Sequence, residues 1–101
     1  MLIDKPHMTR QAIQTKFLPP TNFKPARVTA WAEAGRVTLS WDHGANIERN
    51  HAIAAHALAE KFGWRGAWYC GALPNSGGFA FVCLDTAYDD GQPFFQLAGK
   101  A

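Results

Sequence analysis

The segment ARVTAWAEAGRVTLSWD, from Ala26 to Asp42, constrains the fold more than any other part of the chain. Apolar and polar residues alternate on both sides of Glu33-Ala34-Gly35, as they do in strands, where successive side chains point to opposite faces. The spacing therefore predicts an antiparallel hairpin that turns at these three residues. We expect its buried face to carry Val28, Ala30, Ala32, Val37, Leu39 and Trp41, and its other face Arg27, Thr29, Trp31, Arg36, Thr38 and Ser40.

A helix is predicted directly after this hairpin, from about Ile47 to Phe62. Asn46 is a suitable N-cap, because its side-chain oxygen can accept a hydrogen bond from an early helix amide, and Gly63 suits the position just past the end. At 3.6 residues per turn, one face of the helix is apolar and is expected to pack on the sheet. That face holds Ile47, His51, Ala54, Ala55, Leu58 and Phe62.

Further strands are predicted on either side of this unit. Residues 11–18 alternate until Pro19 and Pro20, which cannot continue a ladder. WRGAWYCGALPNSGGFAFVCL is typical of a second hairpin turning at residues 75–78. Both of its faces are apolar, so we expect it to be central in the sheet or covered by a partner, with a homodimer through this hairpin as one possibility.

The order of elements is β-β-β-α-β-β, which predicts an α+β domain: an antiparallel sheet of about five strands with one helix packed on one face. A chain of 101 residues suffices for one core. We assign residues 1–10 to a flexible N-terminal extension, residues 11–85 to the domain and residues 86–101 to a C-terminal tail that packs on the sheet or on a partner.

Composition excludes several classes of function. No apolar run reaches membrane-spanning length and the N-terminus lacks the apolar centre of a secretory signal, so we expect a cytoplasmic protein. Two cysteines at this spacing do not fit structural zinc, and the glycines match no phosphate-binding loop. We expect no cofactor and no metal. The net charge of +2 leaves the distribution of cations as the informative quantity.

Polar residues with catalytic potential cluster in WDHGANIERNH, from Trp41 to His51. Because His51 lies near the centre of the helix's apolar face, it should be buried and need a partner, for which we expect Asp42 or a backbone carbonyl at the strand end. The favoured interpretation is a polar clamp that joins strand to helix. The alternatives are a small enzyme that uses Asp42, His43 and His51, or a metal site with the same ligands.

The two cysteines are expected to lie opposite each other if Ser76 and Gly77 form the loop of the second hairpin. Directly opposed residues come close enough for a disulfide. In a reducing compartment, however, two small apolar core residues are the favoured interpretation of Cys70 and Cys83.

A basic surface is predicted on the open face of the sheet. Cations there meet phosphates while an aromatic ring stacks on a base, which is the combination that single-stranded nucleic acid requires. An ordinary solvated sheet face and a protein-binding surface remain alternatives. The candidate binding residues are Lys16, Asn22, Lys24, Arg27, Trp31 and Arg36.

The chain also resembles a group of small uncharacterised proteins of bacterial phages, plasmids and other mobile elements. The likeness covers residues 11–82 and lies in the pattern TKFLPPTN…DH…NH…A…LAEKFGW. It implies a bacterial accessory protein of a kind that binds nucleic acid or blocks a host defence complex, with Asp42-His43 and Asn50-His51 as shared motif positions.

These observations lead to one main hypothesis and two alternatives. The main hypothesis is a non-enzymatic binding module of a mobile element that contacts nucleic acid or a nucleoprotein through the basic sheet face. The first alternative is an inhibitor of a host defence protein such as a CRISPR or restriction complex. The second is the small enzyme described above.

Overall fold

The computed structural model describes residues 11–74 and 77–84, and it confirms the predicted α+β fold. Its elements are β1 (Ile13–Leu18), β2 (Arg27–Ala32), β3 (Gly35–Ser40), α1 (Ile47–Lys61), β4 (Ala67–Ala72) and β5 (Phe79–Leu84). The predicted N-terminal extension and C-terminal tail lie outside the described residues. None of the described helices has both the length and the hydrophobicity to cross a membrane.

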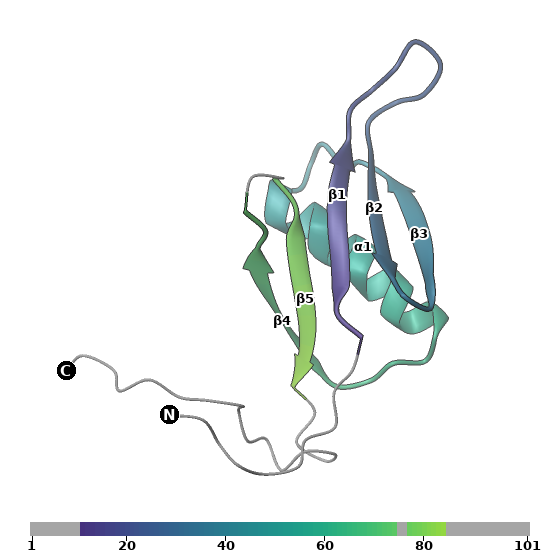
Figure 1. Ribbon diagram of the computed structural model, residues 1–101. Coiled ribbons are helices and arrows are strands. Elements are labelled where there is room, and N and C mark those ends of the chain that lie inside the picture. The colour runs from purple at the N-terminus through teal and green to yellow at the C-terminus, as the bar shows by residue number, and fades with distance from the viewer. Residues whose placement is uncertain (1–10, 75–76, 85–101) are drawn as a thin grey trace, which may run out of the picture.

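The five strands form one antiparallel sheet in the order β3-β2-β1-β5-β4 (Figure 1). β1 lies in the centre because it pairs with β2 on one side and with β5 on the other. The helix crosses one face of the sheet and packs on β1, β2 and β3. The opposite face carries no element of the described chain (Figure 1).

The first hairpin follows the alternation of its sequence. Ala32 pairs with Gly35, so the turn itself consists of Glu33 and Ala34. Val28 and Ala30 are fully buried beneath the helix, and the other residues expected on this face are partly buried and pack around them. The predicted buried face is confirmed.

Both ends of α1 are closed by the predicted caps. The Asn46 side chain accepts a hydrogen bond of 2.7 Å from the amide of Arg49. At the other end, Gly63 has a positive φ of 68°, a conformation that favours glycine, and Trp64 donates its amide to the carbonyl of Ala59 at 2.8 Å. The helix therefore begins at the predicted residue and ends at Lys61, one residue before the predicted end.

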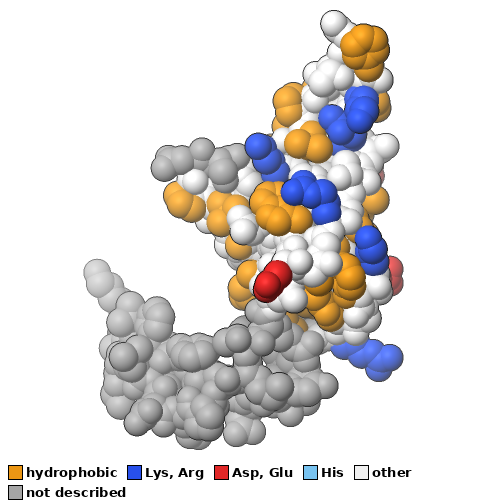
Figure 2. All heavy atoms as spheres, turned by 45° about the vertical axis from the view of Figure 1, so that its right-hand side comes forward, with side chains coloured by type: hydrophobic (Ala, Val, Ile, Leu, Met, Phe, Trp, Pro, Cys, Tyr) orange, Lys and Arg blue, Asp and Glu red, His pale blue; other side chains and the backbone are white. Residues whose placement is uncertain are grey.

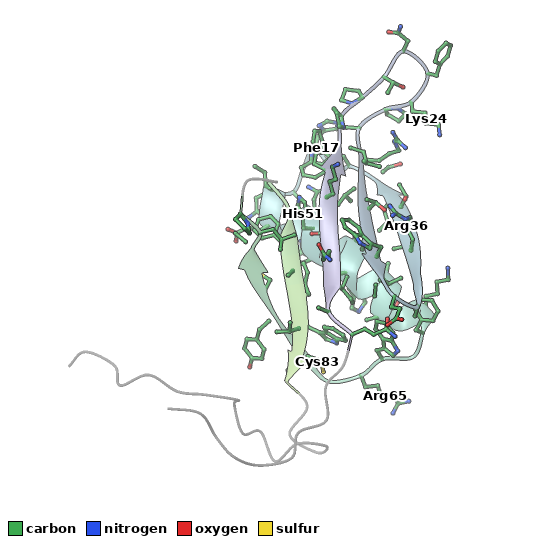
Figure 3. The ribbon with its side chains drawn as sticks, in the orientation of Figure 1. Phe17, Lys24, Arg36, His51, Arg65 and Cys83 are labelled. Atoms are coloured by element: carbon green, nitrogen blue, oxygen red, sulfur yellow. The ribbon has the colours of Figure 1, made fainter. Side chains whose placement is uncertain are left out.

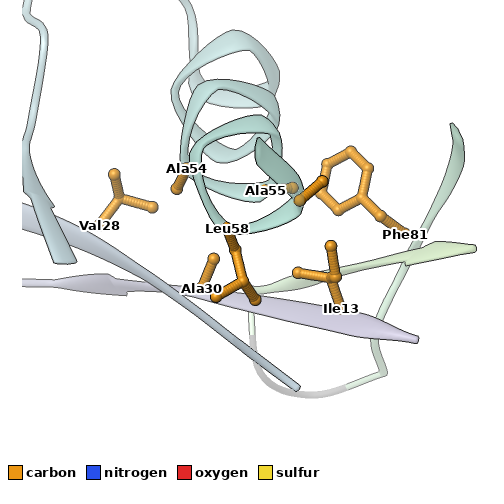
Figure 4. Packing of buried hydrophobic residues seen from close by; sticks show 8 residues of the cluster. Ile13, Val28, Ala30, Ala54, Ala55, Leu58 and Phe81 are labelled. Atoms are coloured by element: carbon orange, nitrogen blue, oxygen red, sulfur yellow. The ribbon is translucent and has the colours of Figure 1, made fainter. Parts of the chain in front are cut away.

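The core lies between α1 and the three strands beneath it, with Phe81 added from β5 (Figure 4). Alanines make up much of the buried surface of the helix. Because their side chains are short, the helix backbone can approach the sheet closely, and Leu58 fills the space between them. The buried cluster is Ile13, Val28, Ala30, Ala54, Ala55, Leu58, Ala59 and Phe81.

The second hairpin differs from its prediction in register and in place. Cys70 pairs with Phe81 and Trp68 pairs with Cys83, so the expected opposition of the two cysteines is wrong by two residues. A shift of two leaves every side chain on its predicted face, since the strand period is two. The hairpin is not central either, because β4 forms an edge of the sheet. The two thiols are not joined, and the sulfur of Cys83 contacts the carbonyl oxygen of Arg65 at 3.4 Å.

Candidate functional site

The face of the sheet turned away from the helix gathers most of the predicted binding residues. Ile13 and Thr15 are buried under α1, so alternation places Lys16 on the opposite face. The register puts Lys16 beside Thr29, which lies on the same strand as Arg27 and Trp31. Arg36 lies directly across from Trp31 on β3. These side chains therefore occupy one continuous surface of β1, β2 and β3.

Arg36 and Trp31 are held together on this surface. The guanidinium carbon of Arg36 lies 5.2 Å from the centre of the Trp31 ring, within the range of a cation–π contact. Arg36 also donates a hydrogen bond of 3.3 Å to the hydroxyl of Thr29, which accepts another from Thr38 at 3.1 Å. One face of the partly exposed indole is therefore in contact with a cation.

An arm formed by residues 19–26 joins β1 to β2 and projects beyond the end of the sheet (Figure 1). The Thr21 hydroxyl accepts hydrogen bonds from the amides of Phe23 and Lys24, and the Thr21 amide donates to the carbonyl of Lys24 at 2.8 Å. Prolines 19, 20 and 25 restrict the backbone on both sides of this turn. The arm thus presents its tip as an ordered turn.

The sequence prediction missed one residue on the arm. Phe23 stands at the tip with 94% of its surface exposed, next to the predicted contact residues Asn22 and Lys24. A large apolar side chain that is almost fully exposed on an ordered turn is available for contact with another molecule. The signal was an aromatic residue in the middle of a proline-rich connection.

Basic side chains predominate on this side of the molecule, although acidic ones are also present (Figure 2). Within the described part of the chain, Lys16, Lys24, Arg27 and Arg36 form no ion pair with a carboxylate, and the ion pair seen there joins His56 to Glu60 on the helix. Figure 2 shows lysine and arginine side chains spread over the sheet face and the base of the arm, with apolar patches between them. This surface therefore offers several cations to an anionic partner.

A clamp between strand and helix is present, but Asn50 forms it in place of the expected His51. Its side-chain oxygen accepts the amide of Asp42 at 2.7 Å. Its side-chain nitrogen donates to the carbonyls of Asp42 at 2.9 Å, Asn46 at 3.0 Å and Ala45 at 3.3 Å. One buried amide thus holds the whole β3–α1 loop.

His51 has a different partner from the one expected. Its ring nitrogen Nδ1 lies 2.7 Å from the hydroxyl of Thr15 on β1, and the ring is fully buried. Asp42 instead accepts the amide of Gly44 at 2.8 Å through its carboxylate. The expected pairing of His51 with Asp42 or with a strand-end carbonyl is wrong, because the helix directs this ring at the centre of the sheet rather than at the end of β3.

The residues proposed for an enzymatic site are therefore not joined by hydrogen bonds. His43 is exposed in the loop, Asp42 is bound to its own loop, and His51 is in the core. Burial lowers the pKa of His51 below its ordinary value of 6.5. In the described ranges, no group of three or more histidine, cysteine or acidic side chains is placed to hold a metal ion.

Comparison of the chain with protein-family models, curated proteins and solved structures finds no match. A proposal about function therefore has to rest on the residues described above.

Proposed function

We propose that this protein is a non-enzymatic module that binds nucleic acid through the open sheet face and the arm. The observation that carries this proposal is the set of four cations, on the arm and on the sheet face that the helix leaves uncovered, that form no ion pair within the described residues. Phosphates supply the missing negative charge, and binding releases their counterions. Sheet faces of this composition bind single strands in other proteins.

Each part of the surface has a distinct role in this proposal. Lys16, Lys24 and Arg27 contact phosphates. Trp31 stacks on a base, while Arg36, in cation–π contact with its ring, neutralises a neighbouring phosphate. Phe23 at the tip of the arm stacks on a second base or enters a base step, as exposed apolar side chains of nucleic-acid-binding proteins do.

The resemblance to mobile-element proteins supports a place for this module among phage or plasmid functions in the bacterial cytoplasm. Within that setting, the second candidate function is inhibition of a host defence protein. The exposure of Phe23 on an ordered arm favours it, because aromatic and arginine side chains also dominate protein interfaces. A homodimer through β4 and β5 is compatible with both functions, since Tyr69 and Val82 are exposed there.

Salt-dependent binding to fluorescent oligonucleotides tests the main proposal. Anisotropy with single-stranded and double-stranded DNA and with RNA, at 25 to 200 mM salt, should show a log–log slope that reports the phosphates contacted. We expect Arg27→Ala/Arg36→Ala to reduce the single-strand slope by about 1.4, because each lost contact removes roughly 0.7.

The matched control is Arg49→Ala/Arg65→Ala, which removes the same charge from exposed positions on the helix and the loop after it. This variant should keep the slope of the unaltered protein. Equal effects of the two double variants, or no binding of any nucleic acid at 25 mM salt, would refute the proposal. Stoichiometric capture of one defence protein that is lost with Phe23→Ala would then favour the inhibitor.

A further inference from the structure

A second surface feature lies on the helix side of the sheet, where β1 and β3 end and α1 begins. A pocket of about 380 Å³ is lined by Phe17, Trp41, Ile47, His51 and Gly77. Most of this lining is apolar. Because a cavity of about 150 Å³ already holds benzene, the pocket has room for a ring system of one or two rings. Figure 3 shows Phe17 and His51 at the end of the sheet from which the arm with Lys24 projects.

His51, one of the residues that line this pocket, carries a ring nitrogen without a hydrogen-bond partner in the described residues. Its Nδ1 is engaged by Thr15, and the edges of the ring pack against Trp41, with ring centres 5.9 Å apart, and Phe79, with centres 4.7 Å apart. Its Nε2 is buried and has no hydrogen-bond partner in the part of the chain that the structure describes. Native proteins rarely leave a buried polar atom unsatisfied, so this nitrogen needs a partner that the described residues do not supply.

The hydrogen bond to Thr15 bears on whether Nε2 carries the ring proton and can act as a hydrogen-bond donor. A separation of 2.7 Å is typical of a hydroxyl donor and short for a ring N–H donor. The other acceptor near this hydroxyl, the carbonyl of Phe79, is 3.4 Å away and competes poorly for its proton. When Thr15 donates to Nδ1, the proton of the neutral ring is on Nε2. The pocket offers one hydrogen-bond donor within apolar walls.

We propose that this pocket binds a neutral, planar heteroaromatic ring whose acceptor atom takes the hydrogen bond from His51 Nε2. The aromatic walls contribute stacking and edge contacts, and the neutral donor selects against cations. Phe17 and Ile47 are 38% and 61% exposed, so rotation of these side chains opens the way to the buried nitrogen. Nucleobases have this chemistry. Two sources supply it: a free nucleoside, and an unstacked base of a single strand.

Nitrogen NMR of the histidine rings tests this proposal, with uridine, adenosine and an octamer of thymidylate as probes. The Nε2 resonance of His51, assigned by through-bond correlation, should shift on titration at pH 7.5 while that of the exposed His56 stays in place. Ile47→Trp closes the mouth of the pocket without changing His51, and should weaken binding at least tenfold. Ile53→Trp places the same residue at a partly exposed helix position outside the pocket and should leave binding unchanged.

The probes separate the two sources. A shift with the nucleosides supports binding of the free ring, and a shift with the octamer alone supports a base presented by a strand. No shift with any probe at millimolar concentration, or a shift that Ile47→Trp leaves intact, would overturn the proposal. This result is distinct from failure of the nucleic-acid interface, because Arg27→Ala/Arg36→Ala should not affect nucleoside binding.

Discussion

Asn50, on the first turn of α1, should contribute more to stability than any polar side chain of the β3–α1 loop. Its amide is 2% exposed and binds the backbone of Asp42, Ala45 and Asn46. Asn50→Ala removes all of these bonds at once. The loop then loses the contact that fixes the end of β3 to the first turn of α1.

The magnitude follows from the protons and lone pairs involved. The oxygen accepts one bond, and the nitrogen has two protons to share among three carbonyls, so about three full hydrogen bonds are lost. At a net value of about 1 kcal/mol each, the loss is about 3 kcal/mol. Alanine's higher helix propensity returns up to about 0.7 kcal/mol. We therefore expect Asn50→Ala to lower the free energy of unfolding by about 2–3 kcal/mol.

Urea unfolding followed by circular dichroism measures this change. Asn46→Ala is the matched comparison, because it removes one capping bond from the same loop and should cost about 1 kcal/mol. The decisive result is which of the two variants has the lower free energy of unfolding. An Asn50→Ala protein as stable as Asn46→Ala, or within about 0.5 kcal/mol of the unaltered protein, would show that water replaces the clamp at no cost and would refute the reasoning.

Asn50→Asp adds a test of the donor half of the clamp. The introduced carboxylate still accepts the amide of Asp42 but faces three carbonyl oxygens, so its pKa in the folded state should exceed the unfolded value of about 3.9. The folded state then binds the additional proton. Relative to the unaltered protein, stability should fall as pH rises from 4 to 7. A difference that does not depend on pH would contradict this interpretation.

Two further predictions concern His51 and the end of the helix. Because burial lowers the pKa of His51 below 6.5, the unfolded state binds more protons in acid, so stability is fully present above pH 6.5 and falls as pH decreases toward the folded pKa. Urea unfolding at pH 7.5 and 5.0 should show this loss of stability in the unaltered protein and also in a His56→Gln variant, in which His56 cannot contribute to it. Equal stability at the two pH values would contradict the prediction. Gly63→Ala forces a residue with a Cβ to a φ of 68° and should cost about 1–2 kcal/mol, although nothing lies within 4 Å of that Cβ. Gly71→Ala, with equal space and no positive φ, should be near neutral, and equal costs for the two would refute the conformational argument.

Most of the fold could be predicted because strands and the helix have sequence patterns that extend over only a few residues. The alternation of 26–42 placed Val28 and Ala30 correctly, and Asn46 and Gly63 marked the two ends of the helix. The element order and the open face of the sheet followed from these. Strand order did not, since antiparallel pairing between β1 and β5 joins segments that no local pattern connects.

The wrong predictions concern features for which the sequence allowed several alternatives of similar energy or plausibility. The loop of the second hairpin contains adjacent serine and glycine residues at which a turn can close in more than one register, so the pairing of Cys70 was misplaced by two. The partner of His51 was misassigned because sequence proximity favoured Asp42, whereas the helix carries the ring across to Thr15, 36 positions away along the chain. Phe23 was missed because the aromatic residue in the proline-rich connection was not considered as a contact residue, and its exposure became evident only in the structure.

The contrast between Asn50 and His51 explains why one of these neighbours is structural and the other is a candidate ligand group. Successive helix positions point about 100° apart, so Asn50 turns to the loop while His51 turns to the sheet. The loop supplies backbone donors and acceptors to both ends of the Asn50 amide. The backbone donors and acceptors of the sheet are used in hydrogen bonds between its strands. Among the described residues, the sheet offers His51 the hydroxyl of Thr15. Half of the imidazole's hydrogen-bonding capacity therefore remains unused in the described structure, at a place where Phe17 and Ile47 leave room for another molecule.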